Sequence, residues 1–438
     1  MAATSDKKEW FQRQFRNFED GLNGQKSMPI HGLRKKAMDQ FMSLDFPDSR
    51  NEDWKYTNIE PILNQTFETA PSTQDEIATK LITPFSIADT AIQLVFIDGR
   101  FSDKLSKLSG LVKGVAVKNL ATALSGDYYE IQSRMHKRLE TNKNIFTALN
   151  SAFVLDGLYV KIDDRAILEK PIYVLHVSTA ADTLQLIQPF NLITVGQSAQ
   201  ISIIENFVSL GAGCAFTNGL TDIHVGADAI VHYVKIQQEN PRSFHIHTTE
   251  IKQDQNSCLK HTLVTSGGAL VRNVVELNLE AEHIESTLNG VYLTHGTQHV
   301  DNRTIIHHAK PNCNSHELYK GILDGKSSGV FNGKIIVHPD AQKTDAKQSN
   351  KNLLLSQDAT MNTKPQLEIF ADDVKCTHGA TIGRLDEESL FYLRSRGVGK
   401  EQAKNMLTYA FAGEIIDRID HEATRTYLDG LLLDCLEH

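Results

Sequence analysis

The sequence predicts a mainly β protein with a β-solenoid core and an α-helical region at each end. Three observations lead to this prediction. Short β-branched or alternating runs, bounded by Gly, Asp and Asn, follow one another for about 300 residues after Ala91. Two of these runs follow similar turn sequences that lie thirty residues apart. Helical periodicity is found before this stretch and returns near Asp386.

Residues 1–90 are expected to form the N-terminal helical region. Apolar residues recur there at helical spacing, at Trp10, Phe11 and Phe15 and again at Leu33, Ala37 and Phe41. Pro29, Pro47 and Pro61 interrupt the pattern, because proline ends or breaks a helix. We therefore expect several short helices.

Residues 91–385 are expected to form the β core, and internal similarity distinguishes a solenoid from a series of sandwiches. Val195–Ala199 precedes the strand-like Ile201–Ile204, and Val225–Ala229 precedes Ile230–Ile236. A looser echo is Val337–Ala341. Strand, tight turn and strand at repeated offsets are typical of stacked coils, in which each rung buries its apolar face against its neighbours.

Residues 386–438 are expected to form the C-terminal helical domain. Asp386 is a suitable N-cap for a helix through Arg396, and Gly397 is a suitable stop. A second helix carries an apolar stripe at Ala403, Met406, Leu407, Ala410, Phe411, Ile415 and Ile419. This hairpin packs on the solenoid or offers a surface to another protein. The residues that we expect to bind a partner are Leu390, Leu393, Met406, Leu407 and Phe411.

Composition narrows the class of protein. The formal charge is −9, and the longest basic run is the three residues Arg34–Lys36, so we expect no nucleic-acid partner. Apolar runs fall far short of the ~20 residues that cross a bilayer, so we expect no membrane span. The five cysteines are odd in number and irregularly spaced, which indicates reduced thiols in a cytoplasmic protein.

Two catalytic signatures are near misses. Gly321–Ser327 resembles a phosphate-binding loop but is one residue short between its glycines, and a strand-like run follows where a helix is required. Gly325–Gly329 fits the spacing of a nucleophile elbow, but that elbow also joins a strand to a helix. A solvated turn is the favoured interpretation of both.

The chain has 18 histidines, many of them in the β region. His307, His308, Cys313 and His316 could together supply metal ligands, since imidazole and thiolate suit zinc or iron. However, His307 and His308 are neighbours on a predicted strand and therefore point to opposite faces. A structural role is favoured for this group.

Cys376 and His378 form a more informative pair. They are two residues apart, so on a strand they project on the same side, about 6–7 Å from each other, and can bind one metal centre together. An iron–sulfur cluster normally takes four protein ligands, so the pair is half a site and the rest must come from across the fold or from another chain. The alternative is a buried cysteine in the last rung with a histidine beside it.

The segment around this pair also resembles a known family. Val374–Thr381 followed by Phe391–Gly397 is similar to the C-terminal signature of the SufB/SufD family of iron–sulfur cluster assembly proteins. Further matches are Asn51–Thr57, Phe96–Arg100, Leu149–Phe153, Gln342–Asp345 and Asn352–Ser356. His378–Thr381 after the cysteine, and the N-terminal match, resemble the shorter of the two branches of the family.

The resemblance implies a right-handed parallel β-helix and a non-catalytic scaffold subunit. It implies a complex with one longer SufB chain, joined through the β-helices, and with two SufC ATPase subunits, one docked on the C-terminal helices. His378 would lie near a SufB cysteine where the nascent cluster assembles, and Cys376 matches a nearby cysteine of less certain role. A transient iron–sulfur cluster would be shared with SufB, and the chain would contribute to iron acquisition.

Several points stay open at this stage. The resemblance implies no cofactor stably bound by the isolated chain, and it leaves open both a flavin on the complex and a homodimer of the isolated chain. It gives no role to His307, His308 or Cys313. The alternatives are a stand-alone homodimeric metal-binding module and, less favoured, a β-helix enzyme acting on polysaccharides.

Overall fold

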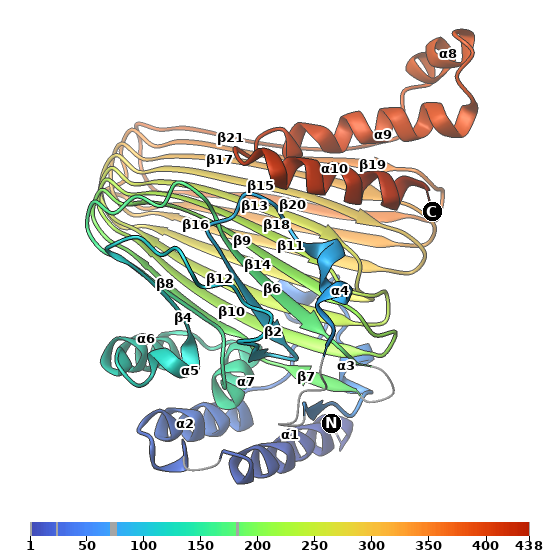
Figure 1. The fold of residues 1–438 in the computed structure, drawn as a ribbon. Coiled ribbons are helices and arrows are strands. Elements are labelled where there is room, and N and C mark those ends of the chain that lie inside the picture. The colour runs from blue at the N-terminus through green and yellow to red at the C-terminus, as the bar shows by residue number, and fades with distance from the viewer. Residues whose placement is uncertain (1, 23–24, 71–76, 181–183, 438) are drawn as a thin grey trace.

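The fold is a parallel β-solenoid with helices at both ends of the chain (Figure 1). The computed structural model describes residues 2–22, 25–70, 77–180 and 184–437. The solenoid has about eight turns, and strands outnumber helices in residue content. The predicted mainly β, parallel β-helix class is confirmed.

Two sheets form the walls of the solenoid, and from β8 onward successive strands alternate between them. In the described residues, sheet A contains β4 (Val115–Asn119), β5 (Leu158–Ile162), β8 (Phe190–Val195), β10 (Ala215–Val225), β12 (Phe244–Gln253), β14 (Leu270–Leu279), β16 (His299–His308), β18 (Ser328–Val337) and β20 (Thr360–Ile369), joined at one side by β7 (Gln185–Ile187) and β1 (Glu68–Thr69). Sheet B contains β3 (Arg100–Phe101), β2 (Ile92–Ile97), β6 (Ile172–Ser178), β9 (Gln200–Ser209), β11 (Ile230–Gln238), β13 (Cys258–Ser266), β15 (Glu285–Thr294), β17 (Asn314–Leu323), β19 (Asp345–Leu354) and β21 (Lys375–Gly383).

The repeat seen in the sequence is the corner between the two sheets. Ser198 and Asp228, the fourth residues of the two repeated turns, have φ angles of 57° and 60°. Gly196 allows a close approach of the chain, because a Cβ there would lie 2.6 Å from Asp164 Oδ1. In the looser third echo the left-handed residue is Lys343, with φ 63°, instead of Asp340. The first two repeats therefore share one backbone conformation and the third departs from it.

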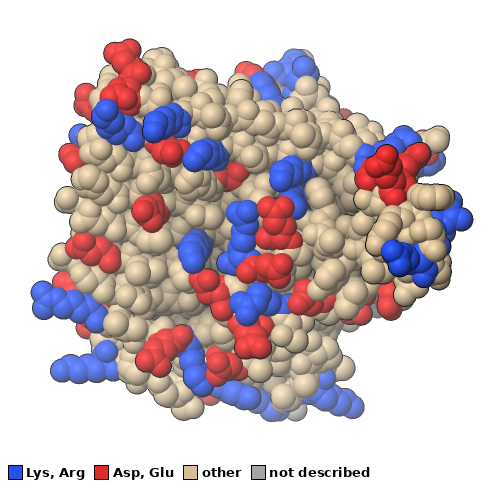
Figure 2. Space-filling view, turned by 90° about the horizontal axis from the view of Figure 1, so that it is seen from above, with Lys and Arg blue, Asp and Glu red and all other residues tan. Residues whose placement is uncertain are grey.

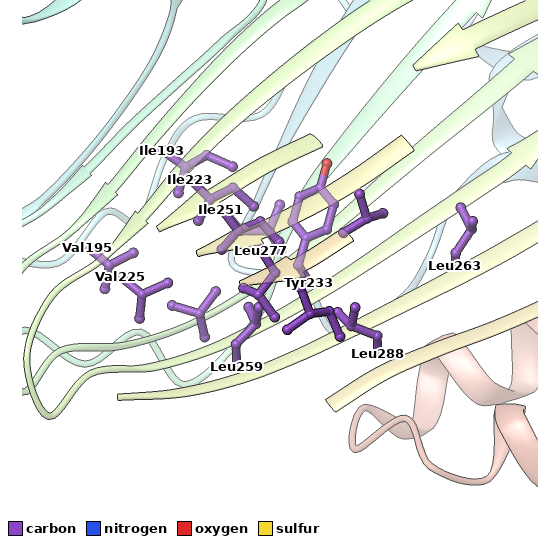
Figure 3. Close-up of a cluster of buried hydrophobic side chains, with 14 of the residues drawn as sticks. Ile193, Val195, Ile223, Val225, Tyr233, Ile251, Leu259, Leu263, Leu277 and Leu288 are labelled. Atoms are coloured by element: carbon purple, nitrogen blue, oxygen red, sulfur yellow. The ribbon is translucent and has the colours of Figure 1, made fainter. Parts of the chain in front are cut away.

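Stacked columns of apolar side chains form the core between the sheets (Figure 3). Ile193, Ile223, Ile251 and Leu277 occupy one register position on four successive strands of sheet A. Val195 and Val225 begin a second column beside it. Each rung therefore covers the apolar residues of the rung before it, which is why a solenoid needs a cover at its ends.

N-terminal helices pack on the outer face of sheet A. The longer ones are α1 (Ala2–Asp20), α2 (Ile30–Ser43), α6 (Tyr128–Thr141) and α7 (Ile145–Phe153); the short ones are η1 (Gln25–Ser27), η2 (Glu52–Trp54), α3 (Glu60–Leu63), α4 (Thr79–Ile82), η3 (Thr83–Phe85) and α5 (Leu120–Ala123). The apolar faces of most of these helices meet outward residues of sheet A such as Phe190 and Phe216, whereas α4 and η3 pack against sheet B. Helices α5 to α7 lie inside residues 91–385, where the sequence analysis expected the β core and named no helix. The sequence does carry a helical signal for α6, because Ile131, Met135 and Arg138 recur at helical spacing and are buried on one face of this helix.

The chain ends with α8 (Glu387–Ser395), α9 (Lys400–Ile416) and α10 (Glu422–Glu437). Asp386 caps α8 as predicted, with its carboxylate accepting from the Ser389 N–H at 2.9 Å. The sequence analysis did not predict α10. In the described part of the chain, no helix has both the length and the apolar character that a bilayer crossing requires.

Candidate functional site

The solenoid ends on an uncovered rung made of β20 and β21. Strand β20 pairs with β18 and β21 with β19, and no described strand pairs with their other edges. Inward residues of β19 are buried, whereas most residues of β21 are exposed, including Ile382 at 47%. Seen from above, basic and acidic residues are both scattered over this end among other residues (Figure 2). An unpaired strand edge of this kind is a template for another chain.

The backbone direction along β21 defines what this edge offers. The Lys375 N–H donates to the carbonyl of Thr344 at 2.8 Å, so Lys375 faces β19. Because backbone groups alternate in direction along a strand, those of Cys376, His378, Ala380 and Ile382 point to the free edge. On β20 the Thr360 N–H donates to Ser327 at 3.0 Å, so the alternate residues, Pro365 among them, face the free edge. Proline has no N–H, which interrupts the donors on that strand.

Cys376 and His378 lie together on β21, as predicted. Cys376 is in register with Ala346 and His378 with Gln348, both of which are buried inside the solenoid, so the pair shares the inward side. Cys376 is half-buried against the core, and burial raises the pKa of its thiol. The His378 side chain is exposed. Among the described residues, no group of three or more His, Cys, Asp or Glu side chains is placed to hold a metal. The pair therefore offers one thiol and one imidazole, and a metal centre there would need further ligands from elsewhere.

A polar layer lies directly beneath the pair. Gln348 Nε2 donates to Glu317 Oε2 at 2.7 Å, and both side chains are buried. Burial raises the pKa of Glu317 to about 7 despite hydrogen bonds from Thr304 and Gln348. This carboxyl therefore gains its proton near neutral pH.

The central histidine group does not form a metal site in the described chain. His307 faces outward, 3.8 Å from Glu276, whereas His308 faces inward and its Nε2 lies 2.8 Å from Ser315 Oγ. Cys313 is buried with its Sγ 3.1 Å from the Ala281 carbonyl oxygen, and His316 is exposed on β17. The opposite orientation of His307 and His308 was predicted and is confirmed.

Sequence reasoning missed a buried ionisable network inside the solenoid. Glu205 lies 2.8 Å from His176 Nε2, and Glu239 lies 2.7 Å from His245 Nδ1. Lys235 Nζ contacts both His245 and Asn273 at 2.9 Å, and burial lowers the pKa of this lysine to about 7. The available signal was that Glu205 and Lys235 occupy inward positions in alternating strands.

Residues 51–57, one of the family-like motifs, bind the outer face of sheet A. The Arg272 guanidinium lies 3.8 Å from the Trp54 ring centroid, and it also pairs with Asp301. Thr57 contacts Asp301 and His299, and Glu52 pairs with Lys364 on β20. The segment thus spans several rungs and reaches the open one.

The glycine-rich near miss is a turn between strands. Gly321–Leu323 belongs to β17, Asp324–Ser327 turns, and β18 begins at Ser328. A strand follows where a phosphate-binding loop or nucleophile elbow needs a helix, as predicted.

The predicted partner-binding residues of the C-terminal helices are divided between two environments. Met406 is exposed at 47%, and Leu390, Leu393 and Leu407 are half-buried. Phe411 instead packs on the chain itself, with Lys320 Nζ 4.5 Å from its ring centroid. Ile415 and Ile419 of the predicted stripe are buried together with Ala412 and Ile416, and these four residues pack against sheet B. Sequence analysis did not single out Phe391 and Tyr392 of α8, which are the most exposed aromatics there, at 74% and 58%.

Comparison with known proteins gives matches over nearly the whole chain. Residues 176–411 match the family model "SUF system FeS cluster assembly, SufBD core domain", and residues 5–174 match "SufBD protein N-terminal region". The chain belongs to the SufB/SufD family. It is 31% identical to the iron–sulfur cluster assembly protein SufD of Escherichia coli K12 over 402 residues, 89% of each chain.

Other SufB/SufD family members show the same extent of similarity. An iron–sulfur cluster assembly SufBD family protein of Synechocystis is 31% identical over 423 residues, covering 95% of this chain and 92% of the relative. SufD of Bacillus subtilis is 23% identical over 412 residues, covering 91% and 92%. These matches support a role in iron–sulfur cluster assembly by the SUF system, and the relatives are named as assembly proteins.

Proposed function

We propose that this chain is a non-catalytic scaffold subunit that pairs with SufB through the open rung and with the SufC ATPase through its C-terminal helices. In this proposal Cys376 and His378 face SufB and contribute to iron acquisition and to a transient cluster shared by the two chains. The observation that carries the proposal is the position of the family-like Cys376–His378 pair. It lies on the last strand of the solenoid, one edge of which is unpaired in the described chain.

The geometry favours a shared site over a site within one chain. The pair provides a thiol and an imidazole, and the described residues bring no third ligand-type side chain to them. Cluster ligation normally takes four protein ligands. A partner strand added at the free edge of β21 would bring its own side chains next to this pair.

The decisive experiment replaces the imidazole in an otherwise intact complex. His378→Ala is expected to reduce cluster maturation at least tenfold, without loss of the partner subunits. His316→Ala is the matched control, since His316 is also an exposed strand histidine but lies outside the proposed site. Normal maturation by His378→Ala would refute the ligand role.

Pairing at the free edge has its own test. Ala380 directs its backbone N–H to the open edge, so Ala380→Pro removes that donor without removing a hydrogen bond to β19. We expect the affinity for SufB to fall about tenfold or more, whereas Ala380→Gly, which keeps the donor, should retain pairing. Equal affinity of the two variants in a titration would contradict edge pairing.

Docking of SufC is proposed on the exposed apolar residues of α8 and α9. Phe391→Asp, Met406→Asp and Leu407→Asp are each expected to abolish capture of SufC while the solenoid stays folded. Thr426→Asp, on the exposed side of α10, is the control. Retained capture by all three variants would refute this docking surface.

A further inference from the structure

One inner column of sheet B leads from the buried interior to the open rung. Glu317, Gln348 and His378 occupy the same register position on β17, β19 and β21. Neighbouring strands of a sheet are about 4.8 Å apart, and residues in register project on the same side. Gln348 is therefore the side chain directly beneath His378.

The amide of Gln348 is held from below and from across the solenoid. Its Nε2 donates to Glu317 Oε2 at 2.7 Å. On the opposite sheet, Gly333 leaves the space that this amide occupies, because a Cβ there would lie 2.3 Å from Gln348 Nε2. Glu317 accepts from the nitrogen side of the amide, so the oxygen side is directed elsewhere.

The oxygen of this amide is buried and accepts no hydrogen bond within the described chain. Gln348 is 1% exposed, and its Oε1 has no hydrogen-bond partner among the described residues. A buried carbonyl oxygen without a donor is costly, so such groups normally find one. The next side chain in the column is the imidazole of His378, which always carries at least one N–H.

We propose that Gln348 is a positioning residue that accepts the ring N–H of His378 and thereby fixes its tautomer and orientation. The other ring nitrogen then keeps its lone pair for the incoming cluster or iron, as outer partners of ligating histidines generally ensure. The functional meaning of this proposed hydrogen bond rests on the role of His378 as a ligand, whereas the hydrogen bond is inferred from the unpartnered Oε1 alone.

The test is the ¹⁵N NMR spectrum of the full chain labelled at histidine, with the His378 signals assigned by their loss in His378→Gln. In the unmodified chain, one ring nitrogen is expected to be protonated and the other not. Gln348→Leu, of similar volume, should shift both signals toward the average of two exchanging tautomers. Asn350→Ala is the control: this buried inward amide on the same strand faces Ala380 and should leave His378 unchanged.

Two further variants keep the test decisive if Gln348→Leu fails to fold. Glu317→Ala removes the acceptor of the Gln348 amide and Gly333→Ala displaces that amide, so each should mix the tautomers of His378. Unchanged His378 signals in the folded variants would overturn the proposal. Because this readout needs neither iron nor SufB, it is independent of the His378→Ala maturation experiment.

Discussion

The two ends of the solenoid differ in how far the inward side chains of their outermost rungs are buried. At the first end, Leu94 and Phe96 of β2 are fully buried, because Phe101, Leu108 and Val117 from the following segment pack against the same core. The two sheets end there in the short strands β3 and β4, which pair antiparallel with β2 and β5. At the last end, β20 and β21 have neither cover nor partner in the described chain. The contrast indicates that the last rung, and not the first, still has inward side chains and strand edges that another chain could cover.

The largest expected difference between the ends is in core truncation. Phe96→Ala removes a fully buried ring at the first rung and is expected to cost about 3–5 kcal/mol of unfolding free energy. Ile382→Ala at the last rung should cost less than about 0.5 kcal/mol, since this side chain is exposed. Urea denaturation followed by circular dichroism measures both. Similar losses would mean that the last rung is covered in solution.

The segment 51–57 makes a second comparison, since it packs on the Arg272–Asp301 ion pair at a buried rung and forms an ion pair of its own at the open one. Arg272→Ala leaves Asp301 buried without its partner and is expected to cost about 3–5 kcal/mol. Lys364→Ala breaks an exposed pair with Glu52 and should cost less than about 1 kcal/mol. Thermal unfolding of the two variants checks this order, and a larger loss for Lys364→Ala would reverse it.

The polar layer beneath the open rung predicts a pH dependence. The pKa of Glu317 is raised to about 7 in the folded chain, so its favourable contribution is present below its unfolded pKa of about 4.5 and is lost as pH rises through 7. Glu317→Gln should therefore stabilise the chain at pH 8, by up to about 3 kcal/mol, relative to its effect at pH 5. Stability curves at the two pH values measure the difference. A gain that is equal at both would show that Glu317 titrates normally.

The smallest expected effect concerns the interrupted edge of β20. Pro365→Val restores one backbone donor to the free edge, and one hydrogen bond is worth about 0.5–1.5 kcal/mol. Self-association through the open end should tighten about twofold to tenfold in sedimentation experiments. Gln366→Val is the control, because the backbone of Gln366 faces β18. An unchanged association constant for Pro365→Val would mean that β20 does not take part.

Local patterns predicted most of the fold because each rung repeats the same requirements. The turn residues before Ile201 and Ile230 signal a corner, and the alternation within each strand signals which residues face inward. The pairing of Cys376 with His378 followed from strand geometry alone. The family resemblance, by contrast, was needed to give the pair a function.

The features that sequence reasoning missed depend on contacts between distant segments. Gln348 meets Glu317 from the preceding rung and Gly333 from the opposite sheet, and no local pattern encodes that meeting. The environment of Phe411 was missed for the same reason, since its ring lies against Lys320 of β17. Helix α6 was missed although Ile131 and Met135 carry its period, because the surrounding strands dominated the interpretation.

Having one closed end and one open end also limits how many chains can join in line. A rod with two adhesive ends polymerises into a filament, because every added unit exposes a new site. Here the inward side chains of the first end are buried and the edge strands β3 and β4 are short, so the proposed end-to-end association would use the last rung of each chain and consume both sites at once. Such a union terminates at two chains, whether they are identical or paralogous. The buried first end would therefore prevent assembly beyond two chains, so that β21 could keep a free edge without the protein forming a fibre.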